Sequence, residues 1–98
     1  MKQNILLEAR YLIKLVLKED PKNSEAKKLL SQLETKLKGH VDILLETGDR
    51  LYRDGEIEGA KAAWHAALTL DPSDKRAKEK IKRAQKVLDN LESLKKPE

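Results

Sequence analysis

Residues 41–74 read VDILLETGDRLYRDGEIEGAKAAWHAALTLDPSD and contain the clearest helix and turn signals of the chain. It contains two stretches with helical apolar spacing, which are separated by Asp54-Gly55 and closed by Asp71-Pro72. Glycine commonly ends a helix, and proline cannot continue one. The segment therefore predicts a helix, a tight turn, a second helix and a second turn.

The rest of the chain has the same periodicity, so the sequence predicts about five antiparallel helices. Residues 5–18 are apolar at more positions than a single helical stripe requires. No segment alternates with period two, which makes the predicted fold class all-α. The further helices are expected from a turn and N-cap at Lys22-Asn23-Ser24 to a C-terminal cap at Gly39, from an N-cap at Asp42 to Asp54-Gly55, over 56–70, and after Asp74.

An internal repeat is found when the sequence is compared with itself at an offset of 51 residues. Asp20-Pro21 then aligns with Asp71-Pro72, and small or apolar residues align on both sides of this turn. The repeated unit is a helix, an Asp-Pro turn and a second apolar-striped helix. The aligned pairs are Ala9 with Ala60, Ile13 with Trp64, Leu17 with Leu68, Ala26 with Ala77, Leu30 with Ile81, and Leu37 with Leu88.

The segment 41–74 resembles a tetratricopeptide repeat (TPR), a helix-turn-helix unit of protein-binding scaffolds. The resemblance implies close helix crossing at Gly48, with Ala60 and Ala67 as the facing small residues, and Trp64 as a core plug. It is carried by Gly48, Leu51, Tyr52, Gly55, Ala60, Trp64, Ala67, Leu68 and Asp71-Pro72.

The resemblance also implies the domain organisation. We expect a single domain over 1–98, built as an antiparallel helical-hairpin array of the TPR-like, α-α superhelix type. Within it, 1–39 would be a half-repeat hairpin, 40–74 a complete unit and 75–96 a capping helix. One full repeat is fewer than the three or so that usually make a stable array, so an oligomer or a longer parent chain is also expected.

In the TPR family the inner face of each unit's first helix lines the ligand groove. This face is acidic with an apolar edge, which suits a basic or apolar peptide; a plain solvated face is the alternative. Leu45 and Asp49 stand where chaperone-binding members have a lysine and an asparagine, so a carboxylate clamp is not expected. By resemblance the groove residues would be Asp42, Leu45, Glu46, Asp49, Tyr52 and Arg53.

The last predicted helix has a basic face at Arg76, Lys80 and Arg83. Three interpretations stay open for this face: binding to nucleic acid phosphates, attraction of an acidic partner, and internal pairing with the acidic segment from Asp42 to Asp49. No aromatic residue is interleaved with the basic ones and no nucleic-acid motif is present, so nucleic acid is the weakest of the three.

The first predicted helix has an apolar face that is too broad for one neighbour. The face of Ala9, Ile13, Val16 and Leu17 would be covered by the second and third helices folding back, by another copy of the chain, or by a helix from a longer parent chain. Self-association through this face is therefore one of the predicted functions.

Composition excludes several other classes of protein. The chain has no cysteine, and its two histidines, His40 and His65, lie far apart without a constellation of nucleophile and base. We therefore expect no catalysis, no metal site and no cofactor. No apolar run is long enough to span a membrane, and the default compartment is the cytoplasm, with export as an alternative for an excised domain.

The expected function is protein–protein interaction, as an adaptor or a part of a scaffold. The partner would be another polypeptide docked in the groove near Leu45, Asp49 and Tyr52. Self-assembly through the first helix is the alternative, and nucleic-acid binding through the basic last helix is the third.

Overall fold

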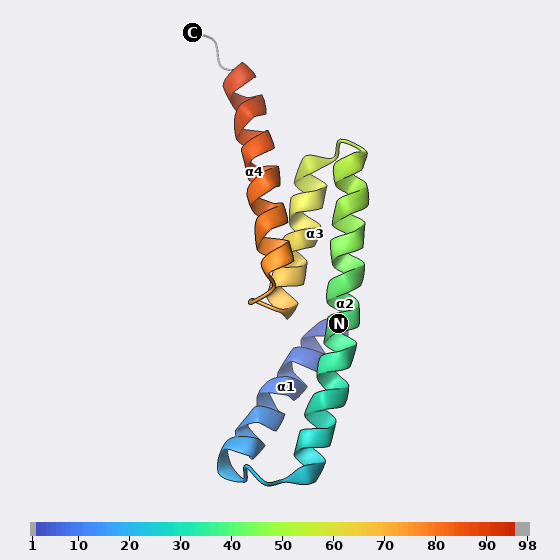
Figure 1. Ribbon diagram of the computed structural model, residues 1–98, viewed down its shortest axis with the longest axis vertical. Coiled ribbons are helices and arrows are strands. Elements are labelled where there is room, and N and C mark those ends of the chain that lie inside the picture. The colour runs from blue at the N-terminus through green and yellow to red at the C-terminus, as the bar shows by residue number, and fades with distance from the viewer. Residues whose placement is uncertain (1, 96–98) are drawn as a thin grey trace. The chain divides into compact units, whose positions relative to one another are not determined.

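The computed structural model describes residues 2–95, with side chains from Ile5 on. This part of the chain folds into four helices: α1 (Lys2–Glu19), α2 (Ser24–Arg53), α3 (Ile57–Leu70) and α4 (Lys75–Lys95) (Figure 1). The described residues contain no strand, so the predicted all-α class is confirmed. Residue 96, the last of the expected capping helix, lies outside them.

The expectation of about five helices is wrong, because the second and third predicted helices are one continuous helix, α2. Gly39 lies inside it and does not cap it, and Asp42 is not an N-cap. The buried residues Leu37, Val41 and Leu45 follow one another at helical spacing, so continuing the helix keeps one apolar stripe unbroken. A helical glycine costs only about 1 kcal/mol against alanine, which this burial outweighs.

The chain divides into two compact units between His40 and Val41. The N-terminal hairpin consists of α1 and the part of α2 up to His40. The C-terminal unit consists of the rest of α2, α3 and α4. Each unit is described by itself below.

The core of the C-terminal unit is made of small residues around one large aromatic ring. Trp64 on α3 is only 2% exposed, and its ring centroid lies 5.7 Å from that of Tyr52 on α2. The small residues let α3 approach its neighbours closely, which gives this short helix a buried face without long side chains. Buried alanines are Ala60, Ala63 and Ala67 on α3, and Ala77 and Ala84 on α4.

Gly48 is buried beneath the indole of Trp64. A Cβ at this position would lie 2.5 Å from Trp64 Cδ1 and 2.8 Å from its Cε2. The indole Nε1 donates a hydrogen bond to the carbonyl oxygen of Leu45, at 3.3 Å. The expected close crossing at Gly48 is present, but the residue pressed onto it is Trp64 rather than Ala60 or Ala67.

The two Asp-Pro turns are built with the same hydrogen bonds, 51 residues apart. α1 ends at Glu19 and α3 at Leu70, while α2 begins at Ser24 and α4 at Lys75. In the first turn the Asn23 amide donates to the Asp20 carbonyl, and the Asn23 side chain accepts from the Ala26 amide. In the second, Asp74 makes the corresponding bonds with Asp71 and Ala77. The internal repeat is therefore present in the structure as well as in the sequence.

Within residues 2–95 no helix combines the length and the apolar character that crossing a membrane requires.

Candidate interaction surfaces

The basic face of α4 lies against the acidic part of α2 in the C-terminal unit. Arg76 Nη2 donates to Asp42 Oδ1 at 3.2 Å, and Lys80 Nζ donates to Asp49 Oδ1 at 2.8 Å. Lys80 Nζ also lies 5.8 Å from the centroid of the Trp64 ring, within the range of a cation–π interaction. For Arg76 and Lys80 the structure therefore contains internal pairing, which is one of the three interpretations of this face.

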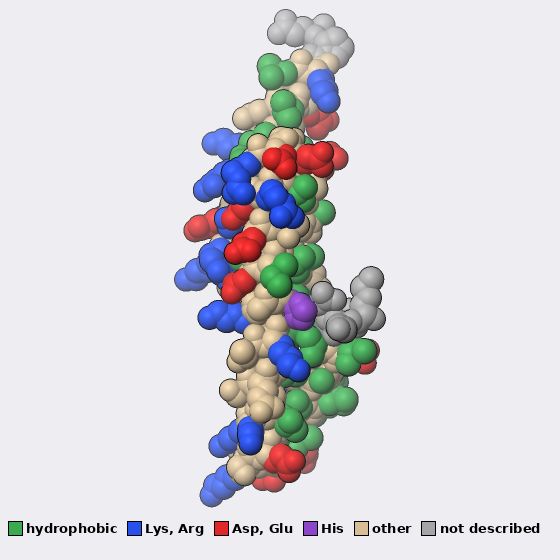
Figure 2. All heavy atoms as spheres, turned by 90° about the vertical axis from the view of Figure 1, so that its right-hand side faces the viewer, with side chains coloured by type: hydrophobic (Ala, Val, Ile, Leu, Met, Phe, Trp, Pro, Cys, Tyr) green, Lys and Arg blue, Asp and Glu red, His purple; other side chains and the backbone are tan. Residues whose placement is uncertain are grey.

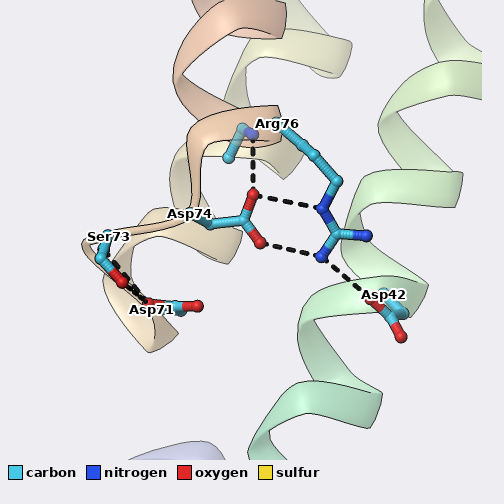
Figure 3. A network of polar contacts seen from close by, with 6 residues as sticks. Asp42, Asp71, Ser73, Asp74 and Arg76 are labelled. Carbon is cyan, nitrogen blue, oxygen red and sulfur yellow. Dashed lines mark hydrogen bonds and ion pairs between the residues drawn. The ribbon is translucent and has the colours of Figure 1, made fainter.

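Arg76 also binds Asp74, the residue that caps the first turn of α4 (Figure 3). Its Nη2 and Nε donate to the two carboxylate oxygens of Asp74 at 2.9 and 3.4 Å. The carboxylate in turn accepts from the Ala77 amide at 3.1 Å. These hydrogen bonds, above all that from Arg76, hold the pKa of the buried Asp74 below its ordinary value of 3.8 although burial opposes the shift.

The lowered pKa of Asp74 predicts an acid-sensitive contribution to stability. A carboxyl group with a depressed folded-state pKa stabilises the fold above its unfolded pKa, and this contribution is lost as the pH falls through the folded value. We expect Asp74→Asn to be less stable than wild type at pH 7. The difference should shrink as the pH falls below 3.8 and disappear once the pH has passed the lower pKa of Asp74 in the folded state, as urea unfolding at a series of pH values would measure.

A matched comparison separates the charge from the cap. Asn23 performs the same capping role in the first turn, so Asp74→Asn should keep the cap and lose only the charge. Asp74→Ala should lose both and cost about 1 kcal/mol or more through the cap alone. An Asn variant as stable as wild type, with an unchanged pH dependence, would show that the ion pair contributes nothing.

The expected groove residues do not form one open surface. Asp42 and Asp49 are paired with α4, and Leu45 is buried with its carbonyl oxygen bonded to Trp64. The prediction that Leu45 lines a groove is wrong, because the apolar stripe of α2 turns it toward the core. Tyr52 is half-buried beside Trp64, while Glu46 and Arg53 are exposed.

The N-terminal hairpin exposes several large apolar side chains. Figure 2 shows hydrophobic side chains gathered over this hairpin. Six large ones are between 43% and 65% exposed: Ile5, Tyr11, Leu12, Leu15, Val16 and Leu29. In a hairpin of two helices, the single neighbouring helix cannot cover every apolar side of α1. Contiguous exposed apolar surface commonly marks an interaction site.

An open groove of about 680 Å³ runs between α1 and the first part of α2. Its walls are mostly apolar, and Lys36 is its only charged lining residue among those that the structure describes. Of the expected self-association face, Ala9 and Ile13 line this groove, Val16 is exposed elsewhere on α1, and Leu17 is half-buried. The principal apolar lining residues are Leu6, Ala9, Ile13, Leu29 and Leu33.

Leu29 is exposed, although helical spacing alone would place it with the buried stripe of its helix. Ala26, Leu33 and Leu37 form that stripe. Leu29 follows Ala26 by three residues, and both that spacing and a spacing of four are compatible with the same helical face. The offset of 51 residues does contain a signal: Leu29 aligns with Lys80, a polar position in the second copy.

Comparisons with protein-family models, with curated proteins and with solved structures returned no match to this chain.

Proposed function

We propose that this protein is a TPR-type protein–protein interaction module, and that its partner-binding surface is the N-terminal hairpin. The resemblance of residues 41–74 to a TPR unit supports the class of module. The large exposed hydrophobic residues of the hairpin carry the choice of surface, because exposed apolar side chains gain most from contact with another chain. The proposal is a binding function without catalysis.

The groove expected by resemblance near Leu45, Asp49 and Tyr52 is a weaker candidate. Leu45 is buried and Asp49 is paired with Lys80, so a ligand there would first have to displace α4 contacts. The basic face has the same difficulty as a phosphate-binding site, because Arg76 and Lys80 already pair with carboxylates.

The proposal is tested by selecting binders from a displayed library of helical peptides, with the full chain as bait. The control bait carries Ile13→Glu and Val16→Glu, which place charge on the groove and on the exposed side of α1. We expect enriched peptides to bind wild type and to lose at least about tenfold in affinity against the variant, since each buried apolar side chain contributes about 1.5–3 kcal/mol. Far-UV circular dichroism checks that the variant is helical.

Peptides that bind the variant as tightly as wild type would place the site outside the hairpin. Failure to enrich any peptide would count against a peptide-binding function altogether.

Self-assembly is the second candidate, since the same exposed hydrophobic residues could meet those of another copy. Light scattering across a dilution series decides between the two. A dimer that Ile13→Glu and Val16→Glu convert to a folded monomer would establish self-assembly through the hairpin. A wild-type monomer at all concentrations would leave binding to a different polypeptide as the function.

A further inference from the structure

The internal repeat indicates what kind of ligand the open groove of the N-terminal hairpin binds. The hairpin of α1 and the first part of α2 corresponds to the hairpin of α3 and α4, with the same helix ends and turn hydrogen bonds at an offset of 51 residues. In the C-terminal unit this second hairpin is covered by another helix, residues 41–53 of α2. The corresponding face of the first hairpin is the open groove.

Three contacts define how residues 41–53 cover the second hairpin. Gly48 lies beneath Trp64, Asp49 pairs with Lys80, and Asp42 pairs with Arg76. α2 and α4 run in the same direction in this unit (Figure 1). A helix bound to the first hairpin in the same way would run parallel to the first part of α2.

The first hairpin presents different chemistry at the same three positions. Ile13 replaces Trp64, Leu29 replaces Lys80, and Glu25 replaces Arg76. Ile13 and Leu29 both line the groove. A helix complementary to the first hairpin therefore has an apolar side chain at the position equivalent to Asp49 and a cationic side chain at the position equivalent to Asp42. It also has room for a Cβ at the position of Gly48, because Ile13 is smaller than Trp64.

We propose that the groove binds an amphipathic helix of a partner protein, parallel to α2, which presents apolar side chains to Ile13 and Leu29 and a cation to Glu25. This inference rests on the proposed function. The dipole of the bound helix supports its direction, since Glu25 would lie near its positive N-terminal end and Lys36 toward its negative C-terminal end.

A second copy of the chain fits the groove less well. Its residues 41–53 would place Asp42 opposite Glu25 and Asp49 on Leu29, which sets like charges together and buries a charge against an apolar side chain. Two hairpins docked face to face would each bring a net charge of +4 over residues 1–39, from nine Lys or Arg and five Asp or Glu. A different polypeptide is therefore the favoured occupant.

Two labelled peptides test the inference by fluorescence anisotropy with the full chain. Both comprise residues 41–53 with Gly48→Ala, and the complementary peptide also carries Asp42→Lys and Asp49→Leu. We expect the complementary peptide to bind at least about tenfold more tightly. In the protein, Leu29→Lys should abolish this preference, while the matched control Leu94→Lys, at an 83% exposed position on α4, should leave it unchanged.

Glu25→Lys provides the specificity test. With this variant, a peptide carrying Asp49→Leu and retaining Asp42 should bind more tightly than the complementary peptide. The peptides contain no tryptophan and the chain has one, so Trp64 fluorescence should stay constant if the hairpin is the site. Equal binding of the two peptides, no effect of Leu29→Lys, or a change in Trp64 fluorescence would overturn the inference.

The two proposals can fail separately. If the library selection yields binders that depend on Ile13 and Val16 but the complementary peptide does not bind, only the assignment of the partner helix falls. If the selection yields none that depends on the hairpin, the proposed function falls as well.

Discussion

Trp64→Ala should lower the free energy of unfolding by about 3–5 kcal/mol, the typical loss for truncating a large buried aromatic residue. Trp64 is almost fully buried and contacts α2 through Gly48, the Leu45 carbonyl and the Tyr52 ring. A small domain has about 5–15 kcal/mol of stability in total, so this loss would bring the C-terminal unit close to unfolding. Urea unfolding followed by far-UV circular dichroism measures it.

The neighbouring exposed residue is the control for this prediction. His65 follows Trp64 on α3 and points to solvent, so His65→Ala should change stability by no more than about 0.5 kcal/mol. Trp64→Phe should fall between the two, because it keeps an aromatic ring but loses the bond to Leu45. A loss below about 1 kcal/mol for Trp64→Ala would contradict the central role of this residue in the core.

Gly48→Ala should destabilise the protein, although alanine is the better helix former. Alanine in a helix gains about 1 kcal/mol over glycine, but the added Cβ would collide with the Trp64 indole. Overpacking of this kind typically costs about 1–3 kcal/mol, so we expect a net loss of up to about 2 kcal/mol. The measurement is again urea unfolding.

Two comparisons isolate the collision with Trp64. Gly39 lies in the same helix with open space around its Cβ position, so Gly39→Ala should stabilise by up to about 1 kcal/mol. In the background of Trp64→Leu, Gly48→Ala should become neutral or stabilising, because the clashing ring is gone. The same loss in both backgrounds would mean that Gly48 is required for another reason.

The ion pairs between α2 and α4 join a basic face and an acidic segment that lie far apart in the sequence. Charge patterning identified a basic face and an acidic segment, but charges on separate helices do not say which residues meet. Arg76 and Lys80 pair with Asp42 and Asp49 because α2 and α4 lie together in one unit. The Arg76–Asp42 pair is exposed and the Lys80–Asp49 pair is partly exposed. Each contributes at most about 1 kcal/mol, so their main effect is on the selectivity of packing.

The all-α class, the Asp-Pro turns at residues 20 and 71, and the internal repeat could all be predicted from the amino-acid sequence. These features depend on local chemistry: apolar spacing, a proline that cannot continue a helix, and short polar side chains that cap the next one. Asn23 and Asp74 occupy the same capping position in the two turns, and the offset of 51 residues is visible in the sequence alone.

Other features depend on tertiary packing, because the local sequence signals for them conflict or are absent. Gly39 has the local character of a helix end, but burial of Leu37, Val41 and Leu45 along one stripe continues α2 through it. The partner of Gly48 depends on which helix crosses it, which sequence spacing does not specify. The open groove beside Leu29 is likewise a tertiary property, because α1 is apolar on more sides than one neighbouring helix can cover.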